Sequence, residues 1–239
     1  MLADMRAAFA FLTILPFRYP EGRAPGAAFA YFPLVGLLIG GVLWLAAALP
    51  WPTASIAAFV VLLLWVLLTG GLHLDGFGDA CDGLLATAPP ERRLEIMKDP
   101  RAGSWAVVGL VLLLLGKWVL LQSAPPATLM APPVVARWAM GLAAYCFPYV
   151  RPTGMGAYFR AGLSWRQLVV ATLITGVVLA GMAWLVNARP LFLLFVPLLT
   201  TFVFGHWAAH RLGGGLTGDV YGAVCELTEL ICLAALVIS

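Results

Sequence analysis

Charged residues are scarce in this chain. They make up 10% of its 239 residues, whereas hydrophobic residues make up 62%. A typical soluble domain has about a quarter charged and about half apolar residues, so the composition excludes an ordinary soluble protein. It also excludes a disordered chain, because disordered chains have too little apolar surface to form a core. Length and composition predict a single domain, residues 1–239, that is built for lipid.

Cysteine and basic clusters are also lacking. The four cysteines form no CxxC pair or other metal-ligand spacing, so we expect free, buried, reduced thiols. The net charge is only +3, and the fourteen Lys and Arg residues are scattered singly between apolar runs. This scatter argues against a nucleic-acid-binding face. No internal repeat or long linker marks a second domain.

Long apolar runs are what the chain has in abundance. About twenty apolar residues cross a bilayer as a helix. The sequence predicts an all-α, polytopic membrane bundle of about seven transmembrane helices, at residues 31–49, 55–71, 104–121, 133–149, 167–186, 190–207 and 220–238. The apolar segment 7–17 is too short to span; it could be a signal-peptide core, but the basic residues after it favour an interfacial or re-entrant segment.

The connections between these runs differ strongly in basic residues. Alternate connections, beginning with the N-terminal stretch, hold eleven Lys and Arg residues, and the opposite set holds one. Because positive residues stay in the cytoplasm, the N-terminus is predicted to be cytoplasmic in a multi-pass protein of the cell (inner) membrane. The same count places the two acidic clusters of the chain on the cytoplasmic side.

The first acidic cluster lies in GGLHLDGFGDACDG, residues 70–83. Asp75, Asp79 and Asp82 are spaced i, i+4, i+7, so they share one face if the second span continues as helix. Carboxylates so close repel each other unless a cation lies between them, and oxygen ligands suit Mg²⁺. The alternative is an acidic, solvated connection. His73, two residues earlier, could move a proton or orient a ligand.

The second acidic cluster opens the last span, in GGGLTGDVYGAVCELTEL. Asp219 and Glu226 are seven residues apart and could face the same way, whereas Glu229 is rotated away and lies deeper. Ionisable groups inside a membrane are costly, so they mark function or are hydrogen-bonded within the bundle. Lys117 and Arg137 are expected to pair with an acid or to extend to an interface.

Basic residues near the acidic clusters are candidate phosphate ligands. Lys98 and Arg101 precede the third span, and Arg151 lies in YVRPTGMG. Lys and Arg bind phosphate by charge and by a planar fork of donors, although such residues also occur as ordinary cytoplasmic flanks of spans. His206 and His210, spaced i, i+4, could hold a metal, but no zinc-protease glutamate follows the first.

Four blocks together resemble a known family. GGLHLDGFGDACDG, MKDPRAG, YVRPTG and GGLTGDVYGA, with FLTILPF near the start, are similar in kind and order to adenosylcobinamide-GDP ribazoletransferases, also called cobalamin 5′-phosphate synthases. The resemblance covers essentially the whole chain. Pro100, Trp105 and a third glycine before Leu216 depart from the expected pattern, but none of them removes a charged group.

The resemblance implies a reaction. Cobinamide phosphate would pass from adenosylcobinamide-GDP to α-ribazole or its 5′-phosphate, with release of GMP. It implies Mg²⁺ as cofactor, with Asp75, Asp79, Asp82 and Asp219 as its ligands or supporting groups, and one of them or His73 as the base. Lys98, Arg101, Arg151 and Glu226 would contact substrate. Membrane lipid and a homo-oligomer are further expected partners.

Two alternatives remain open. A CDP-alcohol phosphotransferase is also polytopic and uses spaced aspartates, but its DGxxAR…GxxxDxxxD pattern lacks the arginine and the later half here. An ion-coupled secondary transporter would use Glu226, Glu229 and Arg137 near the bilayer midplane. The crowding of the acids at one interface and the absence of a repeat argue against transport.

Overall fold

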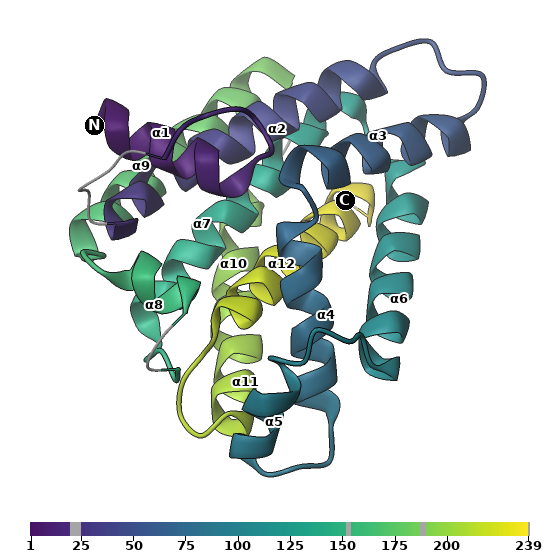
Figure 1. Ribbon diagram of the computed structural model, residues 1–239. Coiled ribbons are helices and arrows are strands. Elements are labelled where there is room, and N and C mark those ends of the chain that lie inside the picture. Colours follow the sequence, from purple (N-terminus) through teal and green to yellow (C-terminus); the bar gives the residue numbers. More distant parts are fainter. Residues whose placement is uncertain (20–24, 152–153, 187–189, 239) are drawn as a thin grey trace.

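The computed structural model describes residues 1–19, 25–151, 154–186 and 190–238. Within these ranges the chain is a bundle of helices without a β-strand, and one isolated bridge joins Tyr149 to Leu216 (Figure 1). The predicted all-α class is confirmed. Arg23 and Arg189, two of the charges used to predict orientation, lie outside the described residues.

Sixteen helical elements follow one another among the described residues. In chain order they are α1 (Leu2–Leu12), η1 (Pro25–Tyr31), α2 (Phe32–Ala47), α3 (Ala54–Thr69), α4 (Leu72–Leu85), α5 (Pro90–Ile96), α6 (Ser104–Leu121), η2 (Pro126–Met130), α7 (Ala131–Cys146), α8 (Met155–Arg160), α9 (Trp165–Val186), η3 (Pro190–Leu194), α10 (Phe195–Leu199), η4 (Thr200–Phe204), α11 (Gly205–Arg211) and α12 (Gly218–Ile238).

Five helical stretches are long and apolar enough to cross a membrane. They are residues 25–47, 104–121, 165–184, 192–211 and 218–238, and the bent pair α3–α4 is a sixth candidate. The chain is therefore a polytopic membrane protein. The remaining predicted span, 133–149, corresponds to α7, which has only 16 residues. The count of seven spans and the orientation therefore remain predictions. The predicted segment 7–17 begins within α1, which ends at Leu12.

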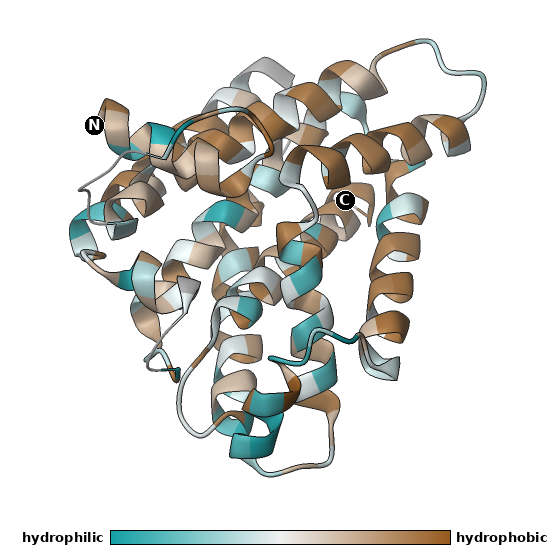
Figure 2. Cartoon of the chain, in the orientation of Figure 1, coloured by the Kyte–Doolittle hydropathy of each residue, from teal (hydrophilic) through white to brown (hydrophobic). Residues whose placement is uncertain are grey.

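The bundle has a buried centre and an apolar outside. Every residue of α7 from 131 to 144 is buried, and α7 and α12 pack against each other. By contrast, α6 exposes a face of large apolar side chains that includes Val108, Leu112 and Leu115. Figure 2 shows apolar residues along α2, α3 and α6 and hydrophilic ones around α5. An exposed surface with so many apolar side chains is suited to contact with lipid rather than water.

Glycines allow the central helices to approach closely. A Cβ on Gly36 would lie 2.4 Å from the carbonyl oxygen of Pro133, where α2 meets α7. At the crossing of α4 and α12, a Cβ on Gly76 would lie 3.1 Å from Asp219 Cα, and one on Gly222 would lie 3.2 Å from His73 O. Small residues at both partners therefore bring the backbones of the two acidic segments together.

The second predicted span does not continue as one helix into the acidic segment. α3 ends at Gly70, and α4 turns away from it by 90°. Gly70 and Gly71 both have left-handed backbone conformations, at φ 61° and 69°, which glycine adopts without steric cost. The condition set for a shared face, one helix continuing from the second span, is therefore not met, yet the three aspartates still share one helix, α4.

Four buried charges connect three helices in the interior. Lys117 Nζ of α6 donates to Glu226 Oε2 and Glu229 Oε2 of α12, at 2.5 Å each. Arg137 of α7 donates to the other oxygen of Glu229. Two cations and two carboxylates make the cluster neutral overall, as burial in an apolar bundle requires. The expectation that Lys117 and Arg137 pair with acids is confirmed.

The cysteines are all free, and Cys225 and Cys232 are buried as expected. Cys146 is exposed and Cys81 is half-buried, so the expectation of burial is wrong for these two. Cys146 is the last residue of α7, where the helix leaves the core.

Candidate active site

The three aspartates of the first acidic cluster stand on α4 with their predicted helical spacing. Asp79 interacts electrostatically with Asp75, Asp82, Asp219 and Arg151, which places it at the centre of the acidic region. The close crossing of α4 and α12 brings Asp219 of the second cluster to the first, although at least 137 positions of sequence separate Asp219 from the three aspartates of α4. Of the second cluster, Asp219 thus lies in the region of the first cluster, whereas Glu226 and Glu229 pair with Lys117 in the interior.

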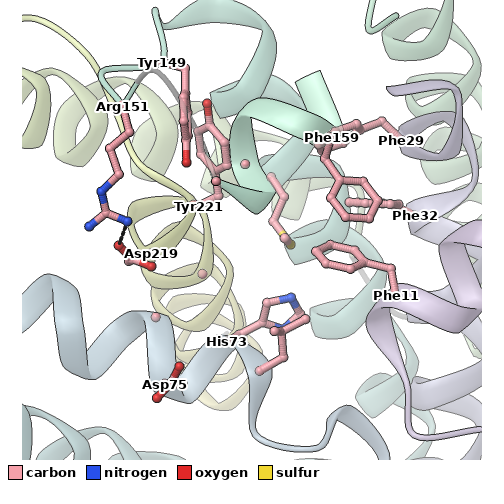
Figure 3. Close-up of a pocket in the computed structure, with 17 residues that line it drawn as sticks. Phe11, Phe29, Phe32, His73, Asp75, Tyr149, Arg151, Phe159, Asp219 and Tyr221 are labelled. Atoms are coloured by element: carbon pink, nitrogen blue, oxygen red, sulfur yellow. Dashed lines mark ion pairs between the residues drawn. The ribbon is translucent and has the colours of Figure 1, made fainter. Parts of the chain in front are cut away.

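A pocket of about 160 Å³ lies where α4 and α12 cross. His73 and Asp75 of α4, Asp219 and Tyr221 of α12, and Arg151 line it (Figure 3). Opposite these polar groups, Figure 3 shows a cluster of four phenylalanine rings, Phe11, Phe29, Phe32 and Phe159. One end of the pocket is thus charged, and the other end is aromatic.

Arg151 is held at the charged end by the backbone around it. Val150 N donates to Leu216 O at 3.0 Å, and Leu216 N donates to Pro148 O at 2.8 Å. This bridge aligns the segment before Arg151 with the segment before Asp219, and Arg151 Nη1 lies 2.9 Å from Asp219 Oδ2. A Cβ on Gly215 would lie 2.6 Å from Pro148 O, so a glycine is needed for the bridge to form.

Asp82 has a different surrounding from Asp75. Its two carboxylate oxygens accept hydrogen bonds from Gly103 N at 2.7 Å and Ala106 N at 2.9 Å, at the N-terminus of α6. These are backbone donors that a helix start leaves without partners. Asp82 and Arg101 line a separate, open pocket of about 360 Å³.

The predicted phosphate ligands Lys98 and Arg101 lie in the connection between α5 and α6, and both are exposed. Arg101 donates hydrogen bonds to Asp99 at 2.9 Å and 2.7 Å. These bonds lower the pKa of Asp99 to about 2, so Asp99 is ionised near neutral pH and neutralises the charge of Arg101. Arg101 would have to exchange this partner in order to hold a phosphate.

His73 points into the pocket from the bend between α3 and α4. It is only 2% exposed, and its Nε2 has no hydrogen-bond partner among the described residues. Its Nδ1 lies 3.7 Å from Cys225 Sγ. A buried polar atom without a partner is costly, which makes Nε2 a candidate contact for substrate.

Glu226 does not line either of these pockets. It is buried and paired with Lys117 in the interior cluster. Its contact with substrate remains a prediction; in the structure its partner is Lys117.

Two carboxylates, rather than a complete set of protein ligands, are available to hold a magnesium ion. Among the described residues, no three His, Cys, Asp or Glu side chains are arranged to hold a metal on their own. Mg²⁺ commonly takes one or two carboxylates and completes its shell with water and substrate phosphates. Asp75 and Asp219, which face one pocket and offer oxygen ligands only, match that requirement.

Sequence reasoning missed the aromatic half of the pocket. Tyr149, Tyr221 and Phe11 all lie within sequence blocks already singled out, namely YVRPTG, GDVYGA and FLTILPF. The clue was that each block carries an aromatic residue beside its polar ones. Phe159 and Phe29 stand outside those blocks, and only the fold brings them to the pocket.

Comparison with known proteins agrees with these blocks. Residues 4–237 match the family model described as cobalamin-5-phosphate synthase. The chain is 42% identical to an adenosylcobinamide-GDP ribazoletransferase of Stutzerimonas stutzeri, over 96% of this chain and 95% of the relative. It is 39% identical to one of Desulfitobacterium hafniense (95% and 93% covered) and 35% identical to one of Trichormus variabilis (100% and 98% covered). No solved structure gave a significant match. With a match over nearly its whole length, the chain belongs to the cobalamin-5-phosphate synthase family.

Proposed function

We propose that the chain transfers cobinamide phosphate from adenosylcobinamide-GDP to α-ribazole or α-ribazole 5′-phosphate. The products are GMP and adenosylcobalamin or its 5′-phosphate. Family membership and the names of the relatives support this activity. The observation that carries it is the single pocket lined by two carboxylates, an arginine and a buried histidine.

Different residues would provide the base and the phosphate contacts that this phosphate transfer needs. A ribose hydroxyl oxygen attacks the phosphorus atom that bears cobinamide, the bond from that phosphorus to the GMP oxygen breaks, and the hydroxyl proton passes to a base. Asp75, Asp79 or His73 is that base, since His73 and Asp75 line the pocket and Asp79 follows one turn later on α4. Arg151 would hold a phosphate through its fork of donors. Lys98 and Arg101, exposed in the connection between α5 and α6, are proposed as further phosphate contacts.

We further propose Mg²⁺ as the cofactor. Asp75 and Asp219 would hold it with Asp79 nearby, while Asp82 supports the site by fixing α6 against α4. When bound, Mg²⁺ supplies positive charge to the phosphate oxygens and to the leaving GMP. The side chains provide the rest, namely orientation of the two substrates and acceptance of the proton.

The site is proposed to face the cytoplasm from the inner membrane. The excess of basic residues in alternate connections supports this orientation. Lipid would cover the exposed apolar faces of α3, α6 and α9, and a homo-oligomer is compatible with them. Neither a CDP-alcohol donor nor ion-coupled transport is favoured by any observation. The residues suggested for transport, Glu226, Glu229 and Arg137, are paired in the neutral cluster.

The test is direct assay of the purified protein in detergent. Adenosylcobinamide-GDP, α-ribazole 5′-phosphate and Mg²⁺ are mixed with the protein, and GMP and cobalamin phosphate are separated by chromatography. We expect product that depends on metal and disappears with EDTA. Asp75→Asn should lower kcat at least about 100-fold, because it removes a charge from the reacting centre.

Glu91→Gln serves as the matched control, since Glu91 is an exposed carboxylate on α5 and should leave the rate unchanged. Absence of product from folded wild-type protein, with product from a CDP-alcohol donor, would replace the proposal by the phosphotransferase alternative.

A further inference from the structure

The aromatic end of the pocket is the feature that the transfer reaction itself does not require. Phe11 and Phe159 pack as a tilted pair with ring centroids 3.8 Å apart, and Phe29 and Phe32 form a second tilted pair with centroids 4.4 Å apart. Met140 lies among the lining residues as well. Phosphoryl transfer needs charge and orientation, so an apolar wall on the same pocket indicates that part of a substrate is flat and apolar.

The volume of the pocket limits which part of a substrate can enter it. A cavity of about 150 Å³ lined by apolar side chains is known to accept a benzene-sized ring. The whole pocket, with its charged and aromatic ends together, measures about 160 Å³, which admits a group of the order of one ring system and excludes a corrin macrocycle. The corrin must therefore remain at the mouth, and only a nucleoside can enter the aromatic end.

Chemistry distinguishes the two bases that the reaction involves. Guanine, in the donor, carries hydrogen-bonding groups around most of its edge, and phenylalanine rings would leave those groups without partners at high cost. The dimethylbenzimidazole of ribazole has two methyl groups on one edge and one free ring nitrogen on the other. Its apolar edge matches the phenylalanine wall, so the acceptor base fits this end better than guanine.

Two buried polar groups stand between the aromatic and the charged ends. His73 is 2% exposed and Tyr221 is 4% exposed, and neither His73 Nε2 nor the Tyr221 hydroxyl has a hydrogen-bond partner among the described residues. Figure 3 shows His73 between Asp75 and Phe11, and Tyr221 beside Tyr149, with the two ring centroids 6.2 Å apart. A ribazole with its base among the rings would place its ring nitrogen and ribose hydroxyls near these two groups.

We infer that the aromatic end, formed by Phe11, Phe29, Phe32 and Phe159, is the subsite for the base of the acceptor nucleoside, with His73 Nε2 and the Tyr221 hydroxyl as its polar contacts. This inference rests on the proposed function. It directs the ribose toward Asp75 and Asp219, where the attacking hydroxyl is needed, and leaves the donor to approach from the mouth.

Binding and kinetics of Phe159→Leu test the subsite. Loss of a stacking ring should raise the Kd of α-ribazole, measured by equilibrium dialysis, by about tenfold. The KM for α-ribazole should rise to match, while kcat and the KM for adenosylcobinamide-GDP stay within about twofold. The control is Phe204→Leu, in a separate apolar pocket beside Phe77 and Leu84, which should change none of these values.

A second arm uses the wild-type protein and so does not depend on how a variant folds. The α-riboside of unsubstituted benzimidazole should bind several-fold more weakly than α-ribazole, because two methyl contacts are lost. Equal binding of the two nucleosides, or a Phe159→Leu effect confined to the KM of the donor, would overturn the inference. Absence of transfer by wild-type protein that still binds α-ribazole would count against the proposed function alone.

Discussion

Asp82 differs from the other aspartates of α4 in its contacts. Both of its oxygens accept backbone hydrogen bonds at the start of α6, so it acts as the cap of a helix in addition to any charge that it brings. Asp75 faces the pocket instead. The same residue type, seven positions apart on one helix, therefore has two different sets of contacts, and sequence spacing cannot distinguish them.

The variant Asp82→Asn distinguishes the contribution of Asp82 to the start of α6 from any contribution of its charge to activity. An amide keeps one acceptor, so we expect a loss of about 1 kcal/mol in the free energy of unfolding, as for other weakened caps. Activity at saturating Mg²⁺ should stay within about threefold of wild type. Thermal unfolding in detergent and the chromatographic assay measure the two quantities. A large loss of activity that is restored by high Mg²⁺ would show instead that Asp82 binds the metal directly.

At the scale of elements, the crossing of α4 and α12 decides whether a site exists at all. Gly76 and Gly222 let the two backbones approach, and that approach brings Asp75 and Asp219 to one pocket. Neither glycine carries chemistry. Their contribution is the distance between the helices, which fixes the distance between the carboxylates.

Gly76→Leu tests this contribution. A side chain there meets the backbone of Asp219, which cannot move aside as a flexible side chain could. We expect a loss of about 1–3 kcal/mol of stability, as for other overpacked sites, and at least a tenfold drop in kcat. Gly41→Leu is the control, because no heavy atom lies within 4 Å of a Cβ at Gly41. Full activity of Gly76→Leu would contradict the tight crossing.

At the scale of the whole molecule, orientation is the property that most needs measurement. In Figure 1, α5 lies at one end of the bundle and the connection between α2 and α3 at the other. The end of α6 belongs with the latter, because Gln122 hydrogen-bonds to Ser55 at the start of α3. Residues near α5 and residues just after α6 should therefore be on opposite sides of the membrane.

Labelling of single cysteines checks this. In a background with Cys81 and Cys146 replaced by serine, Ser123→Cys should react with a membrane-impermeant maleimide in intact spheroplasts. Glu91→Cys should react only after the membrane is permeabilised. Both positions are exposed, so accessibility within the protein does not confuse the comparison. The reverse pattern would invert the predicted topology.

Much of the fold and part of the site could be predicted from the sequence. Apolar runs predicted six of the long helices within a few residues, since hydropathy is a local property. The break at Gly70 and Gly71 was missed because glycines are compatible with both a helix and a bend. The aromatic half of the pocket was missed because it is assembled from α1, η1, α2 and α8, whose meeting is a tertiary event.

The neutral cluster of Lys117, Arg137, Glu226 and Glu229 has a consequence for the order of synthesis. Lys117 precedes its carboxylate partners by 109 and 112 residues, and Arg137 precedes Glu229 by 92. Because chains are synthesised from the N-terminus, α6 and α7 are made, with their two cations, before the carboxylates that neutralise them. α12 brings both counter-charges and, at its start, Asp219 of the pocket. Neutralisation of the buried charges and completion of the proposed site are therefore a single late step of biogenesis.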